Sequence, residues 1–208
     1  MKLNIDGIRP PYPSPALVGR RILLASASPR RRELLAMILP DFGILSGIDV
    51  DESYPDAMAP EKVPLYLAEK KARAYVGHTA KDDIVITADT VVIIDGKILG
   101  KPAGKEEAFR MLRELSGRTH MVVTGVCVSS GEMHMAFSET TRVTFGQLSD
   151  IEIKEYVERY QPFDKAGAYG IQEWTGAAIE RIDGCFYNVM GLPIHRLYKE
   201  LSAFRPSV

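Results

Sequence analysis

Two long strand-like segments in the second half of the chain, residues 119–130 and 132–146, constrain the fold more than any other feature. They meet at Ser130-Gly131, and such a short connection makes neighbouring strands antiparallel. In the second segment, apolar residues recur at every other position, which assigns one face of that strand to a core. These residues are Met133, Met135, Phe137, Val143 and Phe145. The sheet is therefore predicted to contain antiparallel strands.

Helical and strand-like segments alternate around this pair. Apolar periodicity predicts a buried strand at 22–25 and helices at 29–39, 61–76, 105–117, 149–160 and 194–204. Residues 83–102 are predicted to form a strand, a polar interruption at Asp89-Thr90, a second strand, a turn at Asp95-Gly96 and a short third strand. A further hairpin is expected around Asp183-Gly184. This order predicts an α/β protein with a mixed sheet flanked by helices.

Composition limits the class of protein. Hydrophobic residues make up 46% of the 208 positions, and the net charge of -1 gives no basic field for nucleic acid. No apolar run is long enough to span a bilayer. Cys127 and Cys185 lack CxxC spacing, so a reduced, cytoplasmic protein is expected. Residues 1–20, rich in proline, are expected to form a poorly ordered N-terminal extension, and residues 21–208 a single domain.

Residues 25–35, ASASPRRRELL, place three consecutive arginines where a strand gives way to a helix. Ser28 and Pro29 are typical of the N-cap and of the first helical position. Cations are mildly unfavourable at this end of the helix dipole, whereas free N–H groups and guanidinium groups together hold phosphate well. From this segment alone, a solvated charged helix start and an anion site are equally supported.

Asp89 is the second candidate, because it stands inside an apolar segment between Ile86 and Val91. Burying a lone carboxylate costs several kcal/mol unless a cation or hydrogen bonds compensate for the lost hydration. Either Asp89 caps a bulge, or it is a metal ligand or a base that faces a cleft. Thr90 stands beside it and no turn residue is near, which favours the functional interpretation.

The remaining polar positions are weaker signals. Lys101 alone is typical of a surface lysine. The acidic stretch that contains Glu52 is either a solvated loop or a source of oxygen ligands for a divalent ion. Gln172 lies in a glycine-bearing loop that either reads a base edge or simply connects two elements. No Walker A, Rossmann or histidine motif is present. The residues outline a phosphate-ester or phosphoanhydride hydrolase without naming its substrate.

Several segments together resemble the Maf family of nucleotide pyrophosphatases: LLASASPRRRELL, ITADTVV, GKILGKP, LRELSGRTH, DKAGAYGIQ and NVMGLP. They occur in the order and spacing of the family from Arg21 to Phe204. The resemblance implies an elongated α/β fold like that of the inosine triphosphate pyrophosphatases, with a cleft between two lobes, and a homodimer. It also implies cleavage of a nucleoside triphosphate to the monophosphate and pyrophosphate, assisted by Mg²⁺ or Mn²⁺.

The resemblance implies a substrate as well. The branch of the family that cleaves dTTP and UTP carries the arginine of SPRR, the threonine after the catalytic aspartate and the glutamine of GIQ. These are Arg30, Thr90 and Gln172 in this chain. The branch that cleaves 7-methyl-GTP typically has an aromatic residue after SP and no threonine after the aspartate. The alternatives are a pyrophosphatase for modified nucleotides such as 7-methyl-GTP and a nucleotide-binding regulator of septum formation.

By the same resemblance, Asp89 accepts a proton from the attacking water, and Glu52 and Asp89 are metal ligands. The side chains that the family would place around the triphosphate are Arg30, Arg31, Lys71 and Lys101, with Ser26 and Ser28 lining the turn and Asp164 and Lys165 close by.

Two positions depart from the family pattern. Tandem lysines, Lys70 and Lys71, stand where one lysine is usual, and the register of KARA assigns the role to Lys71. Arg32 replaces a residue that is often Gln, Glu or Lys, and it is expected to face solvent.

Overall fold

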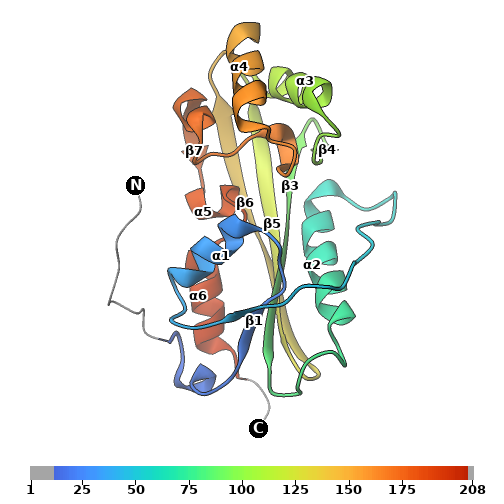
Figure 1. Ribbon diagram of the computed structural model, residues 1–208, viewed down its shortest axis with the longest axis vertical. Coiled ribbons are helices and arrows are strands. Elements are labelled where there is room, and N and C mark those ends of the chain that lie inside the picture. Colours follow the sequence, from blue (N-terminus) through green and yellow to red (C-terminus); the bar gives the residue numbers. More distant parts are fainter. Residues whose placement is uncertain (1–11, 206–208) are drawn as a thin grey trace.

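One mixed sheet runs along the molecule in the computed structural model, which describes residues 12–205 (Figure 1). Its strands are β1 (Ile22–Leu24), β2 (Gly43–Ile44), β3 (Ile84–Ile94), β4 (Lys97–Leu99), β5 (Thr119–Ser130), β6 (Met133–Phe145) and β7 (Ile179–Asp183). The hydrogen-bonded order is β2-β1-β3-β5-β6-β7, and β4 pairs with β3. The β2-β1-β3 pairings are parallel and all others are antiparallel, so the predicted mixed sheet is confirmed.

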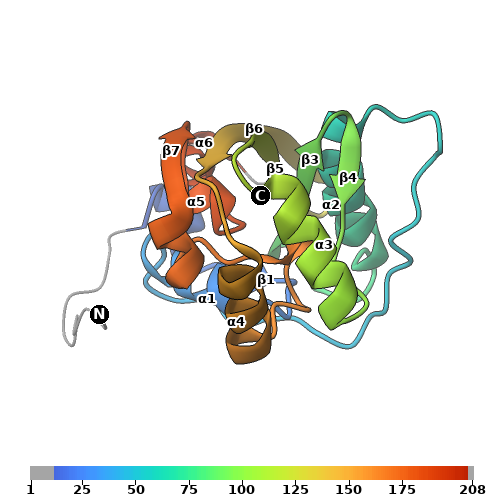
Figure 2. The same ribbon diagram turned by 90° about the horizontal axis from the view of Figure 1, so that it is seen from above.

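Helices flank this sheet on both sides. They are α1 (Pro29–Ala36), α2 (Val63–Ala74), α3 (Lys105–Leu115), α4 (Asp150–Tyr160), α5 (Phe186–Val189) and α6 (Ile194–Ala203). Figure 1 shows α3 and α4 at one end of the long axis and α1 and α6 beside the other half. In Figures 1 and 2, α1 and α2 lie on opposite sides of β3. All five predicted helices are present, with ends that differ by a few residues.

The start of α2 differs from the prediction for a local reason. A 3₁₀ turn at Pro60–Lys62 precedes it, and the α-helix begins at Val63 rather than at residue 61. Pro60 opens the 3₁₀ turn and Pro64 follows the first residue of α2. Proline is tolerated at both places because the N–H groups of a first helical turn have no intrahelical partner.

The predicted polar interruption at Asp89-Thr90 is wrong, because β3 continues unbroken from Ile84 to Ile94. Its pairing with β5 extends through both polar residues and satisfies the backbone on that side. On the other side, β1 pairs only with residues 84–86 and β4 only with residues 92–94. Within the described chain, residues 87–91 therefore border a gap between two strands. Polar side chains are tolerated there because this stretch of β3 faces an opening in the sheet.

The hairpin predicted around Asp183-Gly184 is also wrong. After β7 the chain turns at Gly184 and enters the short helix α5 instead of a returning strand. Thr141 on β6 explains this path, because its hydroxyl donates to the Cys185 carbonyl (3.2 Å) and accepts from the Cys185 N–H (3.0 Å). These bonds hold the chain after the turn against the sheet and occupy backbone groups that a second strand would need.

Alternation along β3 divides the core between the two faces. On one face, Ile84 and Ile86 pack into a cluster with residues of α1 and α6, and Val92 and Ile94 pack with α3 and α4. The other face presents Ile93 to residues of α2. Each face is thus covered by the apolar surface of helices. Burial of apolar surface is the dominant favourable term in folding.

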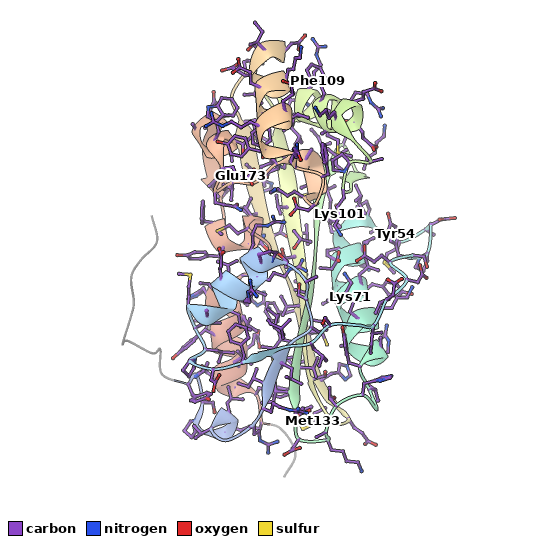
Figure 3. The ribbon with its side chains drawn as sticks, viewed as in Figure 1. Tyr54, Lys71, Lys101, Phe109, Met133 and Glu173 are labelled. Carbon is purple, nitrogen blue, oxygen red and sulfur yellow. The ribbon has the colours of Figure 1, made fainter. Side chains whose placement is uncertain are left out.

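The alternation predicted for β6 is confirmed where the strand is covered. Phe137, Val143 and Phe145 are buried on one face. Met133 stands at the lower end of the strand in Figure 3 and is 38% exposed, because helices do not reach this tip. Both cysteines are free, as their spacing predicts.

Part of the predicted N-terminal extension belongs to the core. Leu17 is completely buried in the cluster that includes α1 and α6, and Ser14 caps the 3₁₀ turn Pro15–Leu17. Residues 12–20 therefore pack on the domain, contrary to the expected loose extension. The expectation for residues 1–11 lies outside the described residues. Within residues 12–205, no helix has the length and apolar character needed to cross a bilayer.

Candidate functional site

A cleft of about 730 Å³ opens at the gap beside residues 87–91 of β3. Its walls come from α1, the loop before α2, α2 itself, the segment after β4, and the loops around residues 164–172 and 189–191. All the candidate site residues line it: Ser26, Ser28, Arg30, Arg31, Glu52, Lys71, Asp89, Thr90, Lys101, Asp164, Lys165 and Gln172. Arg32 does not line the cleft and is exposed, as predicted. The structure thus brings together residues that are as far as 146 positions apart, from Ser26 to Gln172.

Asp89 and Thr90 reach this cleft from opposite faces of β3. Successive side chains of a strand point to opposite faces, so Asp89 meets α2 and Thr90 meets α1. Both face one cleft because no strand of the described chain covers this stretch of the edge. The gap in the sheet is therefore the feature that unites two helices in one site.

Lys71 joins two carboxylates on the α2 side. Its Nζ lies 2.6 Å from Asp89 Oδ1 and 2.8 Å from Glu52 Oε1. The side chains of Lys71 and Asp89 are only 16% and 13% exposed, so this pair is poorly screened by solvent. Burial raises the pKa of Glu52, but the hydrogen bond and charge of Lys71 outweigh it and the net pKa is lowered. One ammonium group therefore organises both acidic groups.

Gly125 permits this close approach of α2. It is paired with Asp89 across the β3-β5 ladder, and a Cβ there would lie 2.3 Å from the backbone nitrogen of Leu65. Any side chain would push α2 off the sheet and draw Lys71 away from Asp89. A glycine inside a strand often marks the close approach of another backbone, but the sequence alone does not say which element approaches.

The donor atoms fit a hard divalent cation that keeps part of its hydration. Asp89 and Glu52 present carboxylate oxygens to one point, which Lys71 Nζ occupies. Within residues 12–205, no group of three or more His, Cys, Asp or Glu side chains forms a complete metal site. Mg²⁺ is commonly held by one or two carboxylates together with waters and substrate phosphates. The two acids therefore match a cation that is shared with a phosphate ligand.

Arg31 is held by neutral acceptors on the α1 side. Its guanidinium donates to the Gly191 carbonyl (2.9 Å), to Thr90 Oγ1 (3.0 Å) and to Ser26 Oγ (3.4 Å). Ser28 caps α1 by accepting from the Arg31 N–H, as predicted. No carboxylate of the described chain forms an ion pair with Arg31, and burial lowers its pKa. Its charge is not offset by an ion pair and is available to an anion in the cleft.

Arg30 and Lys165 are paired with acids. Asp164 lies 2.9 Å from Arg30 Nη1 and 2.9 Å from Lys165 Nζ, and Lys165 also lies 3.1 Å from Glu173 Oε1. Burial raises the pKa of Asp164, but its two cationic partners lower it overall. Tyr156 donates to Glu173 and accepts from the Gly170 N–H (3.1 Å), which fixes the loop. Asp164 therefore holds both cations at the wall of the cleft.

Lys101 and Gln172 are exposed polar residues of the cleft wall. Within residues 12–205, neither side chain has a hydrogen bond or ion pair. The Gly100 carbonyl accepts from the Gly167 N–H (3.1 Å), which ties the Lys101 segment to the loop that carries Gln172. Figure 3 shows Lys101 and Glu173 above Lys71 along the long axis. An ammonium group and an amide are therefore free for a ligand.

The histidines take no part in the cleft, in line with their absence from any motif. None of the four lines it. His120 is buried, its Nε2 lies 2.7 Å from the Tyr169 hydroxyl, and burial lowers its pKa to about 4. A neutral, buried imidazole of this kind contributes to packing.

Sequence reasoning assigned no role to Lys70, and the structure gives it one. Its Nζ lies 2.9 Å from Asp51 Oδ2 and 3.0 Å from the Ser53 carbonyl. Hydrogen bonds from Ser53 and Lys70 lower the pKa of Asp51 to about 2. In the described chain, no backbone hydrogen bond joins residues 46–54 to another element. The tandem lysines therefore clamp two consecutive acids, Asp51 and Glu52, and position their loop.

Replacing Lys70 with methionine is expected to reduce kcat/KM about threefold, because Glu52 is then less well positioned. Little stability is expected to be lost, since exposed ion pairs contribute roughly 0.2–1 kcal/mol. Lys70→Arg is expected to retain activity. If Lys70 acts by placing Glu52, Lys70→Met has no further effect in a Glu52→Gln background, which steady-state kinetics of the four proteins measures. Arg73→Met, on the exposed side of the same helix, is the control. A full effect in both backgrounds would contradict the clamp.

Comparison with known proteins places the chain among nucleotide pyrophosphatases. A family model described as Maf-like protein matches residues 21–204. A dTTP/UTP pyrophosphatase from Porphyromonas gingivalis is 58% identical over 90% of this chain and 96% of its own. A dTTP/UTP pyrophosphatase from Bacteroides fragilis is 50% identical over 87% of this chain and 94% of its own.

A solved structure supports the fold. The HAM1 protein from Coxiella burnetii superposes with a TM-score of 0.51, covering 89% of this chain and 100% of that protein, at 15% identity. The likeness is one of fold, and it agrees with the predicted elongated α/β architecture.

Proposed function

Since the chain belongs to the Maf-like family, we propose that it hydrolyses dTTP and UTP to the monophosphate and pyrophosphate. The observation that carries the proposal is the arrangement around Asp89. Its carboxylate and that of Glu52 share Lys71, and Arg31 and Lys101 line the same cleft. Base, metal-ligating oxygens and anion-binding cations therefore meet in one place, as cleavage of a phosphoanhydride requires.

In this proposal, Asp89 accepts a proton from a water that attacks the α-phosphorus in line with the leaving group. Pyrophosphate leaves with concentrated negative charge, and Arg31 and Lys101 offset it. Arg31 suits this role because neutral acceptors orient it without neutralising it. Lys71 keeps the two acids in position and adds positive charge beside the phosphates.

Glu52 and Asp89 would hold a divalent cation, Mg²⁺ or Mn²⁺, through their carboxylate oxygens. When bound, such a cation neutralises charge on the phosphate oxygens and lowers the pKa of water. The residues of the chain supply the remaining parts. Lys71, beside both acids, has a long and flexible side chain that would let its ammonium group contact a phosphate as well.

A panel of nucleoside triphosphates tests the function. Purified protein with added Mn²⁺ is expected to release pyrophosphate from dTTP and UTP faster than from dCTP, GTP, ATP and 7-methyl-GTP. Preference for 7-methyl-GTP would favour the related pyrophosphatase instead. Nucleotide binding without turnover of any triphosphate would favour the regulatory protein.

Gln172 is proposed to read the base, because its amide is exposed in the cleft and has no partner within the described chain. Gln172→Ala is expected to reduce the preference for dTTP and UTP over the other triphosphates about tenfold, because the hydrogen bond between the side chain and the edge of the base is lost. Gln147→Ala, an exposed glutamine outside the cleft, is the control. An unchanged ranking of substrates in the Gln172 variant would show that Gln172 does not recognise the base.

Three further proposals follow from family membership: a homodimer, a cytoplasmic location, and no binding of nucleic acid. The net charge of -1 supports the last of these. Light scattering of the purified protein tests the dimer, and titration with DNA and RNA at moderate salt tests the absence of nucleic-acid binding.

A further inference from the structure

The proton of the Thr90 hydroxyl has acceptors inside the protein. Its Oγ1 lies 3.0 Å from Arg31 Nη2 and 2.9 Å from Thr124 Oγ1. Thr124 Oγ1 in turn lies 3.1 Å from the Asn188 carbonyl, which only accepts, so Thr124 donates its one proton there. Thr124 then accepts from Thr90, because Thr124 Oγ1 (2.9 Å) is nearer to the Thr90 hydroxyl than its other acceptor, the Gly191 carbonyl (3.5 Å), and Thr90 accepts from Arg31. The result is a directed relay from Arg31 through Thr90 and Thr124 to Asn188.

A second branch runs from Arg31 to the same carbonyl. The guanidinium Nε donates to the Gly191 carbonyl (2.9 Å), and the Gly191 N–H donates to the Asn188 carbonyl (2.9 Å). Asn188 is completely buried, and its amide donates to the Val122 carbonyl (2.9 Å) and to Thr141 Oγ1 (3.0 Å). Two anchors of Arg31 therefore converge on one backbone group that is bonded to the sheet.

Because the relay is buried, breaking any of its hydrogen bonds is costly. Thr124 and Asn188 are 0% exposed, so a hydroxyl or carbonyl that lost its partner there has no water to replace it. Hydrogen bonds aligned in one direction also strengthen one another in a medium of low dielectric constant. Because no carboxylate of the described chain pairs with Arg31, these neutral groups and Ser26 alone orient its guanidinium.

We propose that Thr124 is a positioning residue for substrate binding, which fixes Thr90 and, through Thr90, the guanidinium of Arg31 against the phosphates. The inference rests on the proposed function for the identity of the substrate. It also assigns a role to Thr90. With its only proton donated to Thr124, Thr90 holds Arg31 and donates no hydrogen bond to the nucleotide.

Thr124→Val tests the proposal, because valine keeps the shape of threonine and lacks the hydroxyl. The matched control is Thr87→Val. Thr87 is also fully buried, and its hydroxyl donates to the Ala68 carbonyl of α2 (2.7 Å), on the face of β3 away from Arg31. Both variants are expected to lower Tm by similar amounts, since each loses a buried hydrogen bond.

Only Thr124→Val is expected to raise KM for dTTP and weaken the affinity for inorganic pyrophosphate, each about tenfold, because small misplacements of a binding group cost up to roughly 100-fold. The change in kcat is expected to be smaller than the change in KM. Thr124→Ser, which restores the hydroxyl, is expected to recover both values. In an Arg31→Met background, Thr124→Val is expected to have no further effect on KM or on pyrophosphate affinity, although it still lowers Tm.

Calorimetry with inorganic pyrophosphate separates this inference from the proposed function. A wild-type protein that binds pyrophosphate but cleaves no triphosphate would refute the function and leave the relay standing. Equal pyrophosphate affinities in Thr124→Val and Thr87→Val, or no pyrophosphate binding by the wild type, would overturn the relay. If Thr124→Val does not fold, Thr90→Val, at a half-buried position, replaces it with the same expected shift.

Discussion

Replacing Asp89 with asparagine is expected to reduce turnover of dTTP by about 10²–10⁴-fold, the usual contribution of a general base. Asparagine has nearly the same shape but cannot accept the proton from water. Its carbonyl oxygen still accepts from Lys71, and Glu52 still pairs with that lysine at 2.8 Å, so the ammonium group is not left alone. The fold is therefore expected to persist, with Tm changed by a few degrees. Pyrophosphate release and thermal unfolding measure the two effects.

Asp95→Asn is the matched control for this prediction. Asp95 follows the same strand, carries the same group, and pairs with Arg118 at the surface, outside the cleft. It is expected to retain wild-type turnover. If Asp89→Asn keeps activity close to that of Asp95→Asn, Asp89 is not the base, and Glu52 becomes the carboxylate to test next.

The sheet could be predicted because its signals are local. Alternation in residues 132–146 and the short connection at Gly131 specify an antiparallel pair whatever surrounds them. The path after Gly184 could not be predicted in this way. It depends on Thr141, more than forty residues earlier, whose hydroxyl binds Cys185. The continuity of β3 through Asp89 likewise depends on β5, which supplies the ladder on one side.

The site could be predicted where chemistry and spacing are carried by the residue itself. Asp89 stands out because a carboxylate in an apolar strand needs a partner, and Lys71 provides it. Thr124 carries no such signal, and Gly125 indicates a close backbone approach without identifying the element that approaches. Glycine shows its purpose only when Leu65 is seen against it, and a buried threonine on a strand is ordinary until its hydroxyl is traced to Thr90.

Lys71→Met is expected to have the second large effect, because it removes the one cation shared by Asp89 and Glu52. Two carboxylates then face each other in a partly buried site, which disfavours their charged forms. Turnover is expected to fall at least about 10²-fold, as for the loss of a group that stabilises developing charge. The activity loss alone, however, does not distinguish a phosphate ligand from an anchor for the acids.

The pH dependence of stability makes that distinction. Lys71 holds the pKa of Glu52 below its ordinary value in the folded protein. That stabilisation is present above the ordinary pKa and is lost as pH falls through the folded pKa. The difference in unfolding free energy between the wild type and Lys71→Met is therefore expected to be largest near pH 7 and to shrink in acid. Urea titrations at several pH values measure it.

Lys101→Met is the comparison, because Lys101 has no ion pair within residues 12–205. It is expected to weaken triphosphate binding and to change the pH dependence of stability less than Lys71→Met does, because Lys101 lowers the pKa of Glu52 through its charge alone, whereas Lys71 adds a hydrogen bond. If the unfolding free energy of Lys71→Met follows that of the wild type at every pH, Lys71 does not anchor the acids. In that case the Asp89–Lys71–Glu52 arrangement would contribute nothing to the folded state, and Lys71 would act on the phosphates alone.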